Sequence, residues 1–324
     1  MRTAFNENYL IIKSCFPGEY GKKHALGAFL FLLNGSDAQN VIRMTDILEC
    51  REILKRRLGR FTAFRDYLQL PLVIKMAVAE DPEKYLEGLV NTYNRIMPTY
   101  FTGTGQRFIT AMSLYDNCSE ENLDSNFERM YEIFEYTKAS HPILTGQEDM
   151  MFAAILAADG EDVESVTEEM EKCFNILKPK FRLKNPLQGV SHILALTDRS
   201  PEEKTGKFLN LLDAVKRTGL RFGTGPQMII LAVLSVLDIA AEEAAFQIKE
   251  IYDYLKKNRY IGKLGFSAQT RIMIATAMTA ASNMQDNNII HDDVRIGILR
   301  TVLTSSMTGG MILADSILDM SSHR

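Results

Sequence analysis

The sequence lacks the features that identify a secreted, disulfide-bonded or membrane-spanning protein. Its 324 residues include only 4 cysteines, and none of them lies in a CxxC pair. A chain of this length does not need disulfides to fold, so we expect four reduced thiols. Residues 1–10 lack the apolar segment of a signal peptide. No apolar run approaches the roughly 20 residues needed to cross a bilayer. We therefore expect a cytoplasmic protein that has no membrane partner.

An excess of positive charge is also missing. Lys and Arg together number 37 and Asp and Glu number 41, which gives a formal net charge of -4. This balance argues against a nucleic-acid partner, because binding the phosphate backbone requires a basic surface. Glycine (20) and proline (9) are scarce enough to exclude collagen-like and low-complexity chains. The composition is that of an ordinary globular protein.

What the sequence does contain is an internal repeat. Short apolar runs recur along the chain, most of them end at an aspartate, and from the second run onward a glutamine precedes each one. Successive glutamines are 39 to 42 residues apart. Two sets of markers that agree on a period of about 40 residues indicate one repeated unit. The glutamines are Gln106, Gln147, Gln188, Gln227 and Gln269.

Each repeat has the pattern of a helical hairpin. An almost wholly apolar run is followed by a segment in which apolar residues recur at helical spacing, as in Leu86, Leu89, Val90 and Tyr93. Several of these segments begin with a capping residue followed by proline, as in Asp81-Pro82. No alternating strand pattern competes with this interpretation. Hairpins that cannot bury their own apolar surface stack on their neighbours.

We therefore predict an all-α fold of six to seven helical hairpins, stacked in a right-handed, HEAT-like solenoid that forms a single domain over residues 1–324. Residues 1–23 are expected to be an N-terminal cap and residues 24–69 a degenerate first hairpin. The repeats are expected over residues 70–286, and residues 287–324 are expected to form C-terminal capping helices or a homodimer contact. The alternative arrangement is closure into an α/α toroid, in which the first hairpin contacts the last.

One stretch resembles a known family. From His141 to Ala157 the chain reads HPILTGQEDMMFAAILA. This pattern of His-Pro, a Leu-Thr turn, two acids and an Ala/Leu-rich helix resembles the bacterial family catalogued as domain of unknown function number four thousand and three. The resemblance implies an all-helical cytosolic protein. It implies no activity, and no catalytic residue can be carried over from it.

The same stretch holds the best candidates for chemistry. His141, Gln147, Glu148 and Asp149 lie within nine residues. One histidine and two carboxylates are able to form a metal site or an acid–base pair. Carboxylates in the first turn of a helix also satisfy its free N–H groups, and we favour this structural interpretation. We accordingly predict no metal and no cofactor.

The glutamines form the second set of candidates. In a stack of hairpins they would lie along one edge, where they would either hydrogen bond one unit to the next or line a polar surface that meets a ligand. Arg107, next to Gln106, is a candidate anion site because it lies beside a helix N-terminus. In a closed ring, the glutamines and the 141–149 loop would gather around one mouth.

Two functions are consistent with this pattern. The first is a non-catalytic protein that binds a partner protein or peptide on its concave face, which is the common use of a curved solenoid. The second is a toroid whose central pocket holds a small ligand or a reaction. The sequence contains no nucleophile elbow and no zinc-protease motif, so it favours a protein that is not an enzyme without deciding the question.

Overall fold

The computed structural model describes residues 2–17, 21–34, 41–57, 64, 68–223, 225–258, 267–285 and 293–322. Regular structure within these residues is entirely helical and comprises 15 α-helices and short 3-10 turns. The prediction of an all-helical chain is therefore confirmed for the part of the sequence that is described. None of the described helices combines the length and hydropathy needed to cross a membrane.

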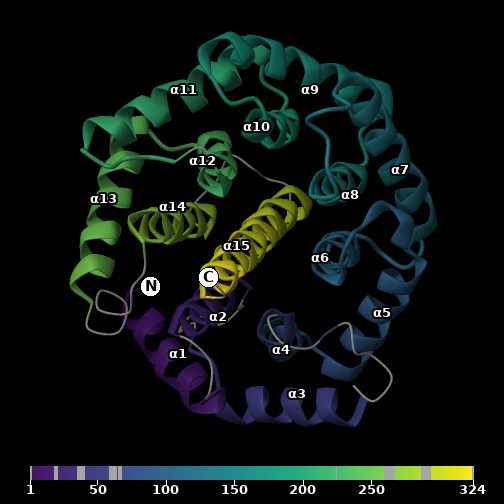
Figure 1. Cartoon of the computed structure of the whole chain (residues 1–324), viewed down its shortest axis with the longest axis vertical. Helices are drawn as coiled ribbons and strands as arrows, with labels where there is room; N and C mark the ends of the chain where they lie inside the picture. Colours follow the sequence, from purple (N-terminus) through teal and green to yellow (C-terminus); the bar gives the residue numbers. More distant parts are fainter. Residues whose placement is uncertain are drawn as a thin grey trace.

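The helices form an outer and an inner layer around α15 (Figure 1). The outer helices are α1 (Arg2–Cys15), α3 (Met44–Arg57), α5 (Pro82–Arg95), α7 (Leu123–Ser140), α9 (Val163–Leu177), α11 (Pro201–Arg217) and α13 (Ala241–Lys257). The inner helices are α2 (Gly21–Asn34), α4 (Gln69–Val78), α6 (Thr104–Tyr115), α8 (Asp149–Asp159), α10 (Asn185–Ala195), α12 (Pro226–Val236) and α14 (Ala268–Gln285). The last helix, α15 (Asp293–Ser322), lies in the middle.

The two layers follow from two hydrophobic patterns. Every residue of α8 from Met150 to Ala157 is buried, as a helix that is apolar on all sides requires. The next helix, α9, buries one face only. The buried residues of α9 are Val166, Thr167, Met170, Cys173, Phe174 and Leu177. Apolar helices therefore take the inner layer, and amphipathic helices cover them and face the solvent.

The predicted capping residues begin the outer helices. The side chain of Asp81 accepts hydrogen bonds from the backbone N–H groups of Glu83 and Lys84, each at 3.0 Å. Ser200 accepts one from the N–H of Glu203 at 3.2 Å. These bonds satisfy donors that have no partner within the helix, so they fix where α5 and α11 begin.

Replacing Asp81 with alanine is expected to destabilise the protein by about 1 kcal/mol, because two N–H groups lose their acceptor. Urea unfolding at neutral pH measures this change. Glu87→Ala, an exposed substitution within the same helix, is the matched control and is expected to change stability by less than about 0.5 kcal/mol. Equal losses in the two variants would contradict the capping role.

Helices α1 and α2, near the start of the chain, lie beside α13 and α14 (Figure 1). Asn6 of α1 donates a hydrogen bond to the hydroxyl of Tyr254 in α13 at 2.6 Å, and Asn258 donates one to Asn6 at 2.8 Å. Arg2 forms an ion pair with Glu250 at 3.7 Å. In the inner layer, α2 contacts α14. Helices from the two ends of the repeat array are thus joined by direct side-chain contacts.

The position of α15 differs from a cap on the end of a stack. It contacts α2, α6, α8, α12 and α14, which belong to widely separated parts of the chain. Its polar side chains bond to two of these helices: Ser305 to Ser113 at 2.9 Å, and Thr304 to Asn34 at 3.2 Å. The predicted C-terminal segment therefore lies inside the helical layers, although its first residues, 287–292, are outside the described ranges.

The beginning of α15 is held by acidic residues. Arg295 lies 3.5 Å from Asp159, 3.6 Å from Glu161 and 2.9 Å from Asp198. Asp159 and Asp198 are two of the aspartates that end the apolar runs of the repeat. Helix α15 therefore starts where α8 and α10 end, and its residues 305–309 reach the opposite face, where the inner helices begin.

Candidate ligand-binding site

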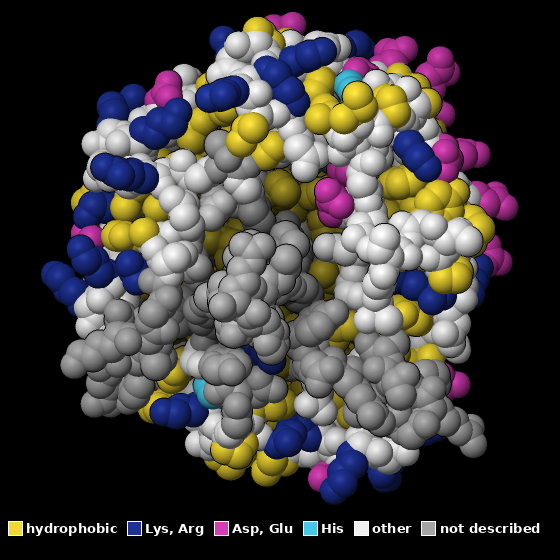
Figure 2. Space-filling model, viewed as in Figure 1, with side chains coloured by type: hydrophobic (Ala, Val, Ile, Leu, Met, Phe, Trp, Pro, Cys, Tyr) yellow, Lys and Arg dark blue, Asp and Glu magenta, His cyan; other side chains and the backbone are white. Residues whose placement is uncertain are grey.

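A pocket of about 710 Å³ lies between α15 and the N-terminal ends of α6, α8, α10 and α12. This volume is within the range of small-molecule sites. Its apolar lining residues are Leu144, Met151, Phe152, Leu183, Pro186 and Ile229. Its polar and charged lining residues include Gln106, Gln147, Glu148, Asp149, Arg182, Lys184, Asn185, Ser305 and Ser306. Figure 2 shows this face, with a hollow that exposes hydrophobic side chains and has an acidic group at its edge.

Asp149 is the buried charge of this pocket. It is the first residue of α8, its side chain accepts the Gly146 N–H at 2.8 Å, and the residue is only 4% exposed. Burial raises the pKa of Asp149 to about 7, and the nearby charge of Glu148 also raises it. In the part of the chain that is described, no basic side chain forms an ion pair with Asp149. Its charge is therefore uncompensated when the carboxyl ionises.

Helix α15 supplies the wall opposite α8. Ser305 is paired with Ser113, whereas the hydroxyl of Ser306 is buried and has no hydrogen-bond partner among the described residues. Gly309 follows on the same helix. The sequence shows a cluster of small residues here, which indicates close helix packing. It does not show that α15 would line a pocket, because that depends on contacts with distant helices.

His141 does not share the site with Glu148 and Asp149. Its Nε2 lies 2.6 Å from the carboxylate of Glu171, and its ring packs at 4.5 Å from the ring of Phe174. Both partners belong to α9, so the 141–149 loop directs its histidine outward and its two acids toward the pocket. Within the described residues, no group of three or more His, Cys, Asp and Glu side chains is placed to hold a metal ion.

Two of the glutamines connect consecutive repeats. Gln147, just before α8, accepts a hydrogen bond from the N–H of Thr102 at 2.9 Å. Gln188, in α10, donates one to the hydroxyl of Thr145 at 2.9 Å. In both cases the glutamine bonds to the loop that precedes the inner helix of the previous repeat. This is the connecting role that the repeat spacing suggested.

The remaining three glutamines have other hydrogen-bond partners or positions. Gln269 donates to the backbone carbonyl of Arg221 at 2.8 Å, which again lies before the previous inner helix. Gln227 contacts Gln269 at 3.5 Å. Gln106 lines the pocket together with Gln147. The glutamines therefore join repeats and also contribute to the polar rim of the site.

Arg107 is not part of the pocket. Its guanidinium lies 4.2 Å from the centre of the Tyr93 ring and donates to the carbonyl of Asn94 at 3.4 Å. The side chain thus packs against α5, and the anion site that its sequence position suggested is not assembled around the pocket.

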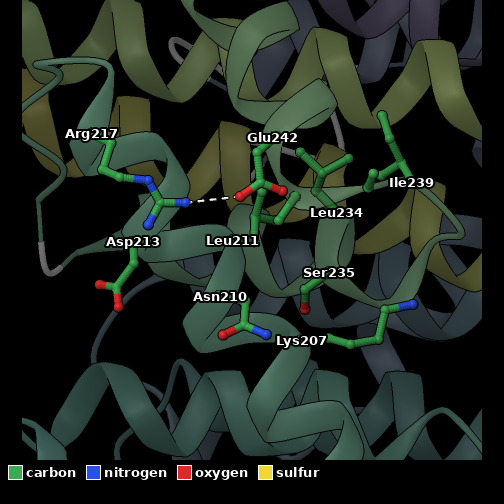
Figure 3. Close-up of a pocket in the computed structure, with 11 residues that line it drawn as sticks. Lys207, Asn210, Leu211, Asp213, Arg217, Leu234, Ser235, Ile239 and Glu242 are labelled. Atoms are coloured by element: carbon green, nitrogen blue, oxygen red, sulfur yellow. Dashed lines mark hydrogen bonds and ion pairs between the residues drawn. The ribbon is translucent and has the colours of Figure 1, made fainter.

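A second hollow, of about 390 Å³, lies between α11, α12 and α13 (Figure 3). Arg217 and Glu242 form an ion pair at 2.9 Å across one end of it, and Lys207 and Asn210 lie at the other. A groove of about 460 Å³ occupies the equivalent position one repeat earlier, next to Arg295. Because these hollows recur with the repeat and their charges are largely paired, we do not take them as the functional site.

Over the described residues, fold and site together define an all-helical protein with a partly apolar pocket beside its central helix. The chain belongs to the family described as protein of unknown function (DUF4003), whose model matches residues 9–307. This confirms the resemblance carried by residues 141–157. The chain is similar to the uncharacterized protein YeaA of Bacillus subtilis (strain 168), with 21% identity over 273 residues, which cover 72% of this chain and 82% of that protein. No solved structure matches the chain.

Proposed function

We propose that this protein binds a small amphipathic molecule in the pocket beside α15. The observation that carries the proposal is the combination of a ligand-sized volume, mainly apolar walls and one buried carboxyl group, Asp149, that has no counter-charge in the described structure. The apolar walls would bind the apolar part of such a ligand. A few polar groups at one end orient its head.

We further propose that the helices form a closed α/α toroid. The contacts between α1 and α13 and between α2 and α14 support closure, because the first and last hairpins of an open solenoid would lie at opposite ends. A concave face for a partner protein would be the surface formed by the inner helices. Helix α15 covers much of that surface, so a small ligand suits the geometry better than a protein or peptide. The four cysteines are free thiols, which supports a cytoplasmic location.

The pocket can be tested with N-phenyl-1-naphthylamine, a neutral apolar dye that fluoresces when it leaves water. We expect saturable binding of one dye per chain. Replacing the half-buried Ile229 with tryptophan fills part of the pocket and is expected to weaken binding at least about tenfold, or ~1.4 kcal/mol.

Asn210→Trp is the matched control, because it places the same side chain in the hollow of Figure 3. It is expected to leave dye affinity unchanged, with helical content checked by circular dichroism for both variants. Absence of saturable binding, or equal losses in the two variants, would show that the pocket is not the binding site.

A further inference from the structure

We propose that the ligand is a protonated amine with an apolar body, and that Asp149 is its counter-ion. This inference rests on the proposed function, since it names the ligand class of the same pocket. It follows from which hydrogen-bonding groups of the pocket are satisfied and which are not.

The carboxylate of Asp149 has hydrogen-bond acceptor sites that no described side chain fills. One of its oxygens accepts the Gly146 N–H at 2.8 Å, and no described side chain donates to the other. A carboxylate has about four lone-pair sites, so most of its capacity is unfilled. At 4% exposure the residue is largely shielded from bulk water, and the pocket that it lines is the space from which a donor can reach it.

A second unsatisfied group lies on the opposite wall. Ser306 of α15 is 6% exposed, lines the pocket, and its hydroxyl oxygen has no partner among the described residues. An ammonium group carries three N–H donors and no acceptor. These donors suit the unfilled acceptor sites of Asp149 in the same pocket.

The basic residues of the pocket do not fill this role. The ammonium of Lys184 donates to the backbone carbonyls of Lys178 and Phe181, which ties it to its own loop. Arg182 is exposed. Glu148 is also exposed and adds a second negative charge close to Asp149. Asp149 therefore gives the buried end of the pocket an acidic character that a cation would neutralise.

The other charge types fit less well. An anionic ligand would place another negative charge beside Glu148 and Asp149, which is unfavourable at short range in a site of low polarity. The N-terminus of α8 would attract an anion, but Asp149 already occupies that position. A neutral ligand would leave the ionised carboxylate unpaired. The apolar walls, formed by Leu144, Phe152 and Ile229 among others, suit a hydrocarbon or aromatic body.

The test compares three probes of similar size that differ in charge: 4-phenylbutylamine, 4-phenylbutan-1-ol and 5-phenylpentanoate. Each competes with N-phenyl-1-naphthylamine at pH 8, where the amine is protonated and Asp149 is mostly ionised, since burial raises the pKa of Asp149 only to about 7. We expect the amine to bind at least about tenfold more tightly than the alcohol, and the carboxylate to bind most weakly. An alcohol or carboxylate that binds as tightly as the amine would overturn the proposal.

Asp149→Asn then assigns the counter-ion. Asparagine keeps the shape and an acceptor for the Gly146 N–H but removes the charge, so the amine affinity is expected to fall to within about twofold of the alcohol affinity. Glu148→Gln, which removes the exposed charge next to it, is expected to have a smaller effect. An undiminished preference for the amine in the Asp149 variant would overturn the assignment.

Dye binding distinguishes failure of the proposed pocket from failure of the proposed preference for amines. Failure of the dye to bind the native protein contradicts the proposed function and this inference together. Dye binding without a preference for the amine contradicts only the inference. Dye binding to the Asp149 variant shows that its pocket is still formed, so a lost preference cannot be attributed to unfolding.

Discussion

Replacing Asp149 with asparagine is expected to stabilise the unliganded protein at pH 8 by up to about 4 kcal/mol, and to change its stability little at pH 4. Burial raises the pKa of Asp149 from 3.8 to about 7 in the folded state. Between these two values the folded protein holds a proton that the unfolded chain releases. The stability contributed by the neutral carboxyl is therefore present at low pH and is lost as the pH rises toward 7.

Urea unfolding of the native protein and of Asp149→Asn between pH 4 and pH 8.5 measures this effect. The difference in unfolding free energy is expected to grow by about 1.4 kcal/mol per pH unit and then to level off above pH 7. Glu87→Gln is the control, because it neutralises an exposed carboxylate on α5 that is not among the groups that shift the pKa of Asp149, so the pH profile should stay unchanged. Parallel profiles for the native protein and the Asp149 variant would show that this carboxyl is ionised in the folded state throughout.

The second large effect concerns a buried ion pair in the helical layers. Lys75 lies 2.8 Å from Asp116, and their side chains are 11% and 7% exposed. Tyr85 donates a hydrogen bond to the same carboxylate at 2.8 Å, and Lys75 also donates to Asn34 at 3.0 Å. The group joins α2, α4, α5 and the end of α6. Burial and the Asp116 charge accordingly raise the pKa of Tyr85 well above its ordinary value.

Asp116→Ala is expected to destabilise the protein by about 3 to 5 kcal/mol, because it leaves the Lys75 ammonium buried without its counter-charge. Replacing both partners, as in Lys75→Met with Asp116→Leu, is expected to recover most of this loss, since no buried charge remains. Urea unfolding at pH 7 of the single and double variants provides the comparison. A double variant as unstable as Asp116→Ala would show that packing, rather than the unpaired charge, accounts for the loss.

The helices were predictable because their signals are local. The apolar run of α8, the capping residue Asp81 and the spacing of the glutamines each depend on a short stretch of sequence. The relation between the two ends of the array was not predictable in the same way. It depends on the angle between successive hairpins summed over the chain, and on contacts such as Asn6 with Asn258, which are 252 residues apart.

In the candidate site too, local sequence features were predictable and contacts between distant helices were not. Glu148 and Asp149 were found because two acids precede an apolar run, and both line the pocket. His141 was grouped with them by distance along the chain, yet its side chain turns to Glu171 of α9. Ser306 lies in a cluster of small residues, a local pattern that indicates close helix packing. Its place in the pocket wall depends on α15 lying among the inner helices, which no local pattern in residues 293–322 indicates.

The contact between α1 and α13 bears on how the molecule opens. A linear array of repeats has two terminal units with one neighbour each, and these units fray first. Here the side chains of Asn6, Tyr254 and Asn258 give the terminal units a second neighbour. In the closed ring that we propose, separating any one repeat breaks two interfaces instead of one. We expect partial unfolding from an end to be disfavoured, and unfolding to be more cooperative because of a junction that involves no covalent bond.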